Sequence, residues 1–327
     1  MKLIIIKEYE AGQRLDKFLA KYMDKAPKSF FYKMLRKKNI ILNKKKAEGN
    51  ERLKAGDEIR LFLSDDTIEN FSGKSDYIKL SRKASPLGLE IVYEDAHVLL
   101  INKPAGLLSQ KARQEDVSLV EELISYLLES GQLKEEELRS FRPGICSRLD
   151  RNTSGLVVAG KSLLGLQAMN ELIRIHAVGK FYRCIVSGVI RKGQRIEGWL
   201  KKDEKSNQVS IYEKEQKDSL FIQTEYLPLK TVTIEDKMYT YLEVHLITGR
   251  SHQIRAHLAS VGHPLIGDAK YGNPQVNRYF LQHFGLQHQL LHAYRLEFPS
   301  LEGCLKPLSN RQFTADLPAI FLEIIGN

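Results

Sequence analysis

The sequence predicts an α+β protein with two parts, a small basic α/β module at the N-terminus and a larger domain of mixed strands and helices. Three observations support this: strand-like and helical patterns follow one another without regular alternation, a polar stretch separates two patterned regions, and positive charge is concentrated at one end. A chain of 327 residues is long enough for two packed cores. We therefore expect domains at 1–64 and 89–327, joined by a linker at 65–88.

The first module combines short helices with small strands. Apolar residues three and four positions apart predict a helix over 14–22, and a second helix is expected over 27–38. Residues 40–42 and 59–63 have strand-like patterns, and the lysines at 44–46 are expected in an exposed turn.

The formal charge of +10 lies almost entirely on the first quarter of the chain. Residues 1–85 hold 21 Lys and Arg against 12 Asp and Glu, whereas the remainder holds 29 against 28. A solvated lysine-rich surface would explain a charge excess, but its concentration in one segment favours a nucleic acid partner, since each neutralised phosphate releases condensed counterions. The side chains that we expect to contact it are Arg36, Lys37, Lys38, Lys44 and Lys45.

The larger domain contains strands and helices in irregular order. Its predicted elements are a hairpin over 89–101, a helix over 117–129, short strands at 145–149 and 156–158, a helix over 162–176, and strands over 181–189 and 239–247. The polar stretch between the last two strands is expected to be an excursion from the fold.

Several classes of protein and site are excluded by composition. No apolar stretch is long enough to cross a membrane, and the N-terminal apolar run is too short for a signal peptide. The three cysteines form no C-x-x-C pair, and the histidines at 252, 257 and 263 have no acid at ligand spacing, so we expect no metal. No glycine pattern indicates a nucleotide cofactor. We expect a soluble cytoplasmic monomer.

An aspartate between two arginines is the most informative feature. Residues 147–155 read Ser-Arg-Leu-Asp-Arg-Asn-Thr-Ser-Gly and lie in an expected loop between apolar strands. The flanking Arg148 and Arg151 favour a charged Asp150 and provide guanidinium groups suited to phosphate. Such a carboxylate could act as nucleophile or base on an anionic substrate, although the residues alone also allow Asp150 to cap the turn.

Two further segments carry candidate site residues. Residues 248–258 pass from a strand into a helix for which Ser251 is the expected N-cap, and free amides at such a helix start attract anions. Arg250 could pair there with a carboxylate from elsewhere, or be an ordinary surface arginine. Tyr182, at the start of a strand, could stack on a base or belong to the core.

Taken together, these segments closely resemble the RluA-type pseudouridine synthases. The resemblance covers roughly residues 89–325, and Ser147 and Asn152 stand where the family usually has histidine and aspartate. The N-terminal module resembles the small RNA-binding domain named after the fourth small-subunit ribosomal protein (S-four). The matching motifs are N-K-P-A-G at 102–106, R-L-D-R-x-T-S-G at 148–155, K-x-Y at 180–182, T-G-R-S-H-Q-I-R-x-H-L at 248–258, G-H-P-L-x-G-D-x-x-Y-G at 262–272, and Leu-His-Ala at 291–293.

The resemblance implies a fold and a reaction. The fold would be that of pseudouridine synthases, with a mixed, largely antiparallel central sheet and flanking helices. The reaction would convert uridine to pseudouridine in RNA without a cofactor: the bond from sugar to uracil nitrogen breaks, and the uracil rejoins the same sugar through carbon. Asp150 would be the catalytic carboxylate, Arg250 its ion-pair partner, and Tyr182 the ring that stacks on uracil.

The resemblance also implies contacts to RNA. The target nucleotide must leave its stack, and Arg148 would fill the gap that it leaves. Arg151 and Lys103 would contact phosphate or support the loop.

Three alternatives remain open on the sequence alone. A non-catalytic RNA-binding or ribosome-assembly protein could retain the fold, a glycosylase would release free uracil, and the target could be transfer RNA. The complete set of Asp150, Tyr182 and Arg250 favours an enzyme. A glycosylase usually needs a second carboxylate. The S-four-like module favours large-subunit ribosomal RNA.

Overall fold

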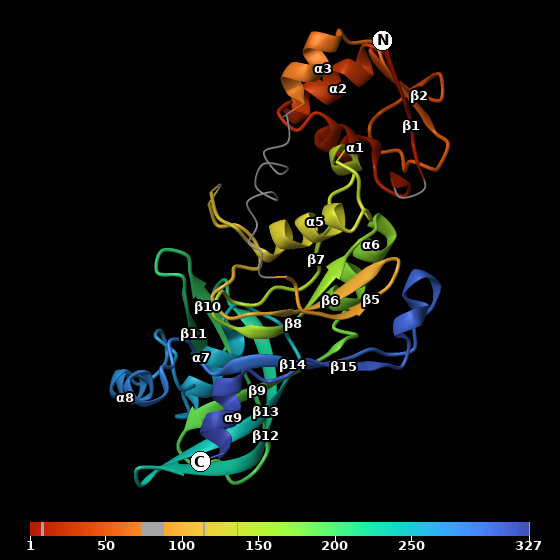
Figure 1. Cartoon of the computed structure of the whole chain (residues 1–327). Helices are drawn as coiled ribbons and strands as arrows, with labels where there is room; N and C mark the ends of the chain where they lie inside the picture. The colour runs from red at the N-terminus through yellow and green to blue at the C-terminus, as the bar shows by residue number, and fades with distance from the viewer. Residues whose placement is uncertain (8–9, 73–87, 114, 136, 327) are drawn as a thin grey trace.

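The computed structural model describes residues 1–7, 10–72, 88–113, 115–135 and 137–326. The N-terminal module forms a unit (Figure 1) with a hydrophobic core of its own. Its helices pack on a four-stranded antiparallel sheet of order β1-β4-β2-β3. Phe18, Leu19, Phe31 and Leu35 are buried between the layers. The elements are β1 (Lys2–Ile5), α1 (Leu15–Tyr22), α2 (Lys28–Arg36), β2 (Ile40–Leu42), β3 (Lys45–Lys46), β4 (Glu58–Leu61) and α3 (Asp65–Phe71).

Helix α3 lies in a stretch predicted as linker. The Ser64 hydroxyl caps the helix by accepting a hydrogen bond from the Thr67 amide. Ile68 is buried, and the Phe71 ring lies 4.7 Å from that of Phe30. So few apolar contacts give no sustained period in the sequence. The remainder of the predicted linker, from 73 to 87, lies outside the described residues.

The larger domain is built on an 11-stranded sheet, which confirms the predicted mixed, largely antiparallel architecture. Its main order is β11-β10-β12-β13-β9-β14-β8-β6-β5, with β15 paired to β14 and β7 to β8. Only the β14–β8 pair is parallel among the pairs between described strands. The strands are β5 (Ile91–Glu94), β6 (Val98–Lys103), β7 (Gly144–Ile145), β8 (Ser154–Gly160), β9 (Gly179–Ser187), β10 (Gln194–Asp203), β11 (Gln208–Tyr212), β12 (Leu220–Ile234), β13 (Lys237–Leu246), β14 (Leu291–Glu297) and β15 (Gln312–Thr314).

The prediction that the stretch between β9 and β13 is an excursion from the fold is wrong. This stretch supplies β10, β11 and β12 to the sheet. On β12, Ile222 and Thr224 are buried, whereas Phe221 and Glu225 are exposed. One solvated face gives these strands a polar composition that resembles a loop.

Helices cover both faces of the sheet. One face packs with α5 (Leu119–Glu129) and α7 (Gln253–Ser260), as their residues share a core with β9 and β13. On the other face lie α6 (Leu163–Arg174), α8 (Pro274–Phe284), α9 (Ala319–Gly326) and the 3-10 helix Gly303–Leu308. A further 3-10 turn spans Glu137–Arg139. Within the described residues, no helix is long and apolar enough to cross a membrane.

The parallel contact between β8 and β14 depends on a glycine. Gly155 has φ +108°, and a Cβ there would lie 2.3 Å from the carbonyl oxygen of Ala293. A side chain at 155 would therefore force the two strands apart. This close contact lies directly after the loop that carries Asp150.

Candidate active site

A cleft of about 780 Å³ brings together segments that are distant in the sequence. Its walls are the loop 147–153 between β7 and β8, the turn 249–255 that leads into α7, and the start of β9. Asp150, Tyr182, Arg250, Arg148 and Arg151 all line it, as do Lys202 and Asn207 from the β10–β11 hairpin. The cleft is large enough for a nucleoside and its phosphates.

The loop that carries Asp150 is held by the segment that follows β6. The Ser109 hydroxyl donates to the Leu149 carbonyl and accepts from the Leu149 amide. The Arg151 carbonyl accepts from the Gly106 amide, and Arg151 Nε donates back to the Gly106 carbonyl. Asp150 is thus flanked on both sides by residues whose backbone is anchored by the rest of the domain.

Lys103 supports this loop from a buried position. Its side chain is 0% exposed, and Nζ donates to the carbonyls of Pro104, Leu107 and Arg151. The predicted phosphate contact is therefore wrong, whereas the alternative of loop support agrees with the geometry. Burial lowers the pKa of Lys103 to about 7, although the charge of Asp150 opposes the shift.

The ion-pair partner of Asp150 is Arg255. Arg255 Nη1 donates to Asp150 Oδ2 at 2.8 Å. The other side of the same guanidinium is bound by Asp268, which accepts from Nε at 2.7 Å and from Nη2 at 2.8 Å. Burial opposes the charge on Arg255, but Asp268 and then Asp150 outweigh it and raise its pKa. Arg255 therefore stays charged between two carboxylates.

The predicted pairing of Arg250 with Asp150 is wrong. Arg250 is exposed at the rim of the cleft, and its backbone amide donates to Gln253 Oε1. The backbone turns sharply at His252, which has φ 54°, and helix α7 begins only afterwards. Ser251, the predicted N-cap, lies in this turn, and His252 takes the cap position. Arg255 is on the first turn of α7, and this turn faces Asp150.

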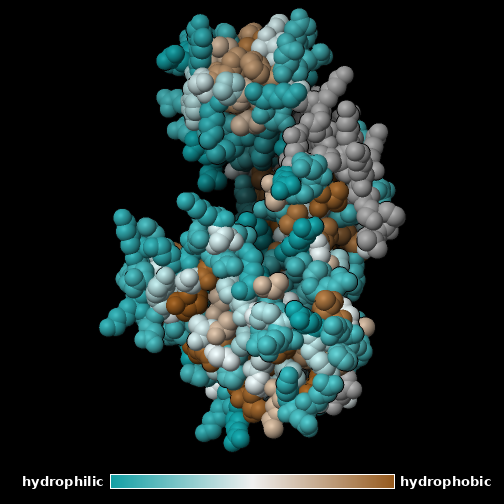
Figure 2. Space-filling model, turned by 90° about the vertical axis from the view of Figure 1, so that its left-hand side faces the viewer, coloured by the Kyte–Doolittle hydropathy of each residue, from teal (hydrophilic) through white to brown (hydrophobic). Residues whose placement is uncertain are grey.

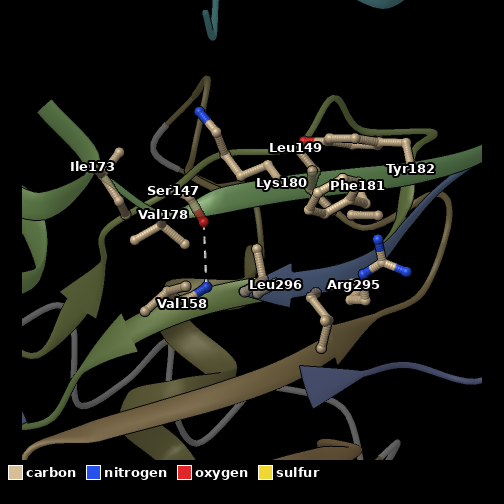
Figure 3. A pocket seen from close by; sticks show the side chains of 12 residues that line it. Ser147, Leu149, Val158, Ile173, Val178, Lys180, Phe181, Tyr182, Arg295 and Leu296 are labelled. Carbon is tan, nitrogen blue, oxygen red and sulfur yellow. Dashed lines mark hydrogen bonds between the residues drawn. The ribbon is translucent and has the colours of Figure 1, made fainter. Parts of the chain in front are cut away.

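Tyr182 lies on β9 within the core that borders the cleft. Its side chain is buried, and burial together with the charge of Asp150 raises its pKa, so the phenol remains protonated. Beneath it lies a small apolar cavity of about 20 Å³, also lined by Leu149 (Figure 3). That cavity holds at most about one water molecule. The nucleoside-sized space is the cleft on the Asp150 side.

Comparison with known proteins decides the family. Residues 97–260 match the family model for RNA pseudouridylate synthase. The chain is 30% identical over 311 residues to an uncharacterized RNA pseudouridine synthase of Mycoplasma genitalium, covering 94% of this chain and 92% of that protein. The chain belongs to the RNA pseudouridylate synthase family. It is an RNA pseudouridine synthase of the RluA type, an isomerase that acts on RNA.

Two further proteins resemble this synthase. One is the ribosomal large subunit pseudouridine synthase C of Vibrio vulnificus, 30% identical over 305 residues, 91% of this chain and 88% of that protein. The other is a solved structure, the human RNA pseudouridylate synthase domain containing 4, which aligns with a TM-score of 0.57. It shares 21% identity over 76% of this chain and 95% of its own, which agrees with the fold.

A histidine that the sequence did not indicate as a neighbour of Asp150 lies close to this carboxylate in the synthase. His252 Nε2 lies 3.9 Å from Asp150 Oδ2, and Nδ1 is 2.9 Å from the Tyr271 hydroxyl. That hydroxyl also accepts from the Val209 amide, so its proton is available to His252. Burial is the main cause that lowers the pKa of His252; the charge of Asp150 raises this pKa, and the charge of Arg255 lowers it. A neutral His252 thus borders the carboxylate.

Arg255 and Asp268 were missed because their signal was ambiguous. Both arginines of the 248–258 motif precede or begin the same helix, and only the helix start distinguishes them. Asp268 belongs to the Gly-Asp pair of the next motif. An acidic residue in a motif that follows one with two arginines indicates an ion-pair partner for one of them.

Proposed function

We propose that this synthase isomerises uridines of large-subunit ribosomal RNA and that Asp150 is its catalytic carboxylate. The observation that carries the catalytic assignment is the side chain of Asp150, 27% exposed in the cleft and fixed by Arg255 at 2.8 Å. The printed name of the Vibrio vulnificus relative supports the ribosomal target. The intact anchoring of the loop disfavours a protein that has only kept the fold.

The two oxygens of Asp150 have different surroundings. Oδ2 accepts from Arg255, while no other described residue donates a hydrogen bond to Oδ1. Oδ1 is thus free to attack the sugar or to remove a sugar proton once the nucleotide has left its stack. If Oδ1 attacks, the C1′–O bond forms as the bond between C1′ and N1 of uracil breaks, and the C1′–O bond breaks when C5 of the turned base bonds to C1′. If Oδ1 removes a sugar proton, the same C1′–N1 bond breaks, and the sugar regains a proton as C5 bonds to C1′. In both routes C5 then loses its proton and N1 gains one, so the product is an isomer of uridine.

The neighbouring groups have supporting roles in this proposal. Tyr182 provides a ring against which uracil stacks, and its protonated hydroxyl makes it a poor base near neutral pH. Arg148, exposed at the cleft, would take the place of the extruded base. Arg151 borders the same cleft and holds the loop through Gly106.

The N-terminal module would add affinity for RNA as an S-four-like domain. Its candidate contacts all lie exposed on the end of α2 and the following hairpin, namely Arg36, Lys37, Lys38, Lys44 and Lys45. Hydrophilic side chains cover much of the visible face of this module in Figure 2. Such contacts with phosphate position an enzyme and do not read bases.

The decisive test compares Asp150→Asn with Asp218→Asn, which removes an exposed carboxylate outside the cleft. We expect the first variant to form no pseudouridine while still binding RNA, and the second to match the wild type. A normal rate for Asp150→Asn would refute the catalytic assignment.

The target is tested by mapping pseudouridine in cells that lack the protein. Loss of specific pseudouridines from large-subunit ribosomal RNA, restored by wild type and not by Asp150→Asn, is the expected result. Loss confined to transfer RNA would refute the ribosomal target, and release of free uracil in vitro would indicate a glycosylase.

A further inference from the structure

A lysine without a counter-charge lines the cleft next to Tyr182. Lys180 lies two residues earlier on β9, and alternate residues of a strand project to the same face. Figure 3 shows Lys180 and Tyr182 extending to the same side of the strand, with Phe181 on the other. Both side chains border the cleft that contains Asp150.

The ammonium group of Lys180 is not accounted for by the protein. No hydrogen bond or ion pair joins Nζ to another of the residues that the structure describes. Lys180 is partly buried, burial lowers its pKa, and no carboxylate compensates the lost hydration. A desolvated, unpaired ammonium is costly, and proteins usually keep one only where a ligand supplies the missing charge.

Nζ of Lys180 lies against a turn in the wall of the cleft, close to a second cation. A Cβ on Gly249 would lie 3.3 Å from Nζ, which places the ammonium against the turn that precedes Arg250. Burial is the largest cause that lowers the pKa of His176, and the charges of Lys180 and Arg250 lower it further. Both cations therefore lie near the His176 ring. Lys180 and Arg250 thus both line the cleft in the vicinity of His176, whereas Arg255 is already neutralised by two carboxylates.

We propose that Lys180 and Arg250 bind the backbone phosphate next to the target uridine and so hold its sugar over Asp150. Phosphate is the anion that an RNA substrate brings at every nucleotide, and a lysine binds it as a point charge. This phosphate subsite gives Arg250 a role other than pairing with Asp150. The inference rests on the proposed catalytic role of Asp150.

The test is a double-mutant cycle in which the cations are removed from the protein and the phosphate charge is removed from the RNA, separately and together. The substrate is a synthetic RNA spanning a uridine that the wild type modifies, with one neutral methylphosphonate linkage placed either 5′ or 3′ of that uridine. We expect one of the two linkages to lower the wild-type kcat/KM at least about tenfold. The double variant Lys180→Met/Arg250→Met should show the same loss on natural RNA and no further loss with that linkage, and Lys180→Met alone should show part of that loss.

Three controls separate this role from a structural one. Lys180→Arg should retain most activity, and Lys201→Met, an exposed lysine of β10 outside the cleft, should match the wild type. Since Met relieves the desolvated charge, Lys180→Met should melt no lower than the wild type. The proposal would be overturned if, at both linkage positions, the loss caused by the variant and the loss caused by the neutral linkage were independent and added in full. Activity of Asp150→Asn on the same RNA would instead refute the catalytic assignment, so the two failures are distinguishable.

Discussion

Replacement of Asp268 by asparagine tests whether Arg255 must be held from both sides. Asp268 is 0% exposed and receives two hydrogen bonds from Arg255, at 2.7 and 2.8 Å. Its Oδ1 also accepts from the amides of Lys270 and Tyr271. Burial alone would raise the pKa of Asp268, but Arg255 outweighs it and lowers that pKa. The carboxylate is therefore charged and fully engaged.

The expected cost follows from these contacts. Asparagine is neutral, has one acceptor oxygen, and presents an NH2 group where Arg255 already donates. Removing one partner of a buried ion pair costs about 3–5 kcal/mol. Because Asp150 still pairs with Arg255, we expect about 3 kcal/mol, or a fall in melting temperature of roughly 6–12 °C at 2–4 °C per kcal/mol for a domain of this size.

Activity should fall further than stability explains. With Asp268→Asn, the Arg255 guanidinium can rotate, so Asp150 loses its fixed partner and kcat should fall more than tenfold at a temperature where the variant is folded. Thermal unfolding and single-turnover pseudouridine formation measure the two effects, with Asp218→Asn as the matched control. A variant that melts within about 1 °C of the wild type and keeps its rate would refute this reasoning.

The pH dependence gives an independent check on the same residue. A carboxylate whose folded pKa is lowered stabilises the protein above the unfolded value of about 4 and loses that contribution as pH falls through the folded value. The stability difference between wild type and Asp268→Asn should thus be complete at neutral pH and shrink in acid. A constant difference down to pH 2 would contradict it.

Four more outcomes follow from the geometry. Arg255→Met should reduce kcat at least a hundredfold, whereas Arg250→Met should mainly raise KM, as steady-state kinetics on the same RNA will show. Lys103→Met removes three hydrogen bonds and leaves the Pro104 and Leu107 carbonyls without this donor, which should cost about 3 kcal/mol in denaturant unfolding. Because the folded pKa of Lys103 is about 7 and the unfolded chain keeps its proton longer, wild-type stability relative to this variant should rise between pH 7 and 10. Replacing Arg36, Lys37 and Lys45 together by Gln should flatten the salt dependence of RNA binding, and an unchanged slope would remove this surface from the interface.

Local patterns determined much of this protein. Helices α1, α2, α5 and α6 lie where apolar spacing predicted them, within a few residues at each end. The loop of Asp150 lies between β7 and β8 because apolar runs flank a polar segment. The family could be identified from motifs because each motif is a short contiguous run, and such runs are readable without any knowledge of distant contacts.

Tertiary structure decided which partners these residues have. Arg250 and Arg255 are equivalent in charge and belong to one motif, but only the left-handed turn at His252 directs the second toward Asp150 and leaves the first at the rim. Lys103 resembles an RNA contact in the sequence, and its buried ammonium donates to the carbonyl of Arg151 in a loop 48 residues later. Strands β10 to β12 read as an excursion because one face is solvated, and their place follows from pairing with β13. Charge and pattern are local properties, whereas pairing and burial depend on which distant segments the fold brings together.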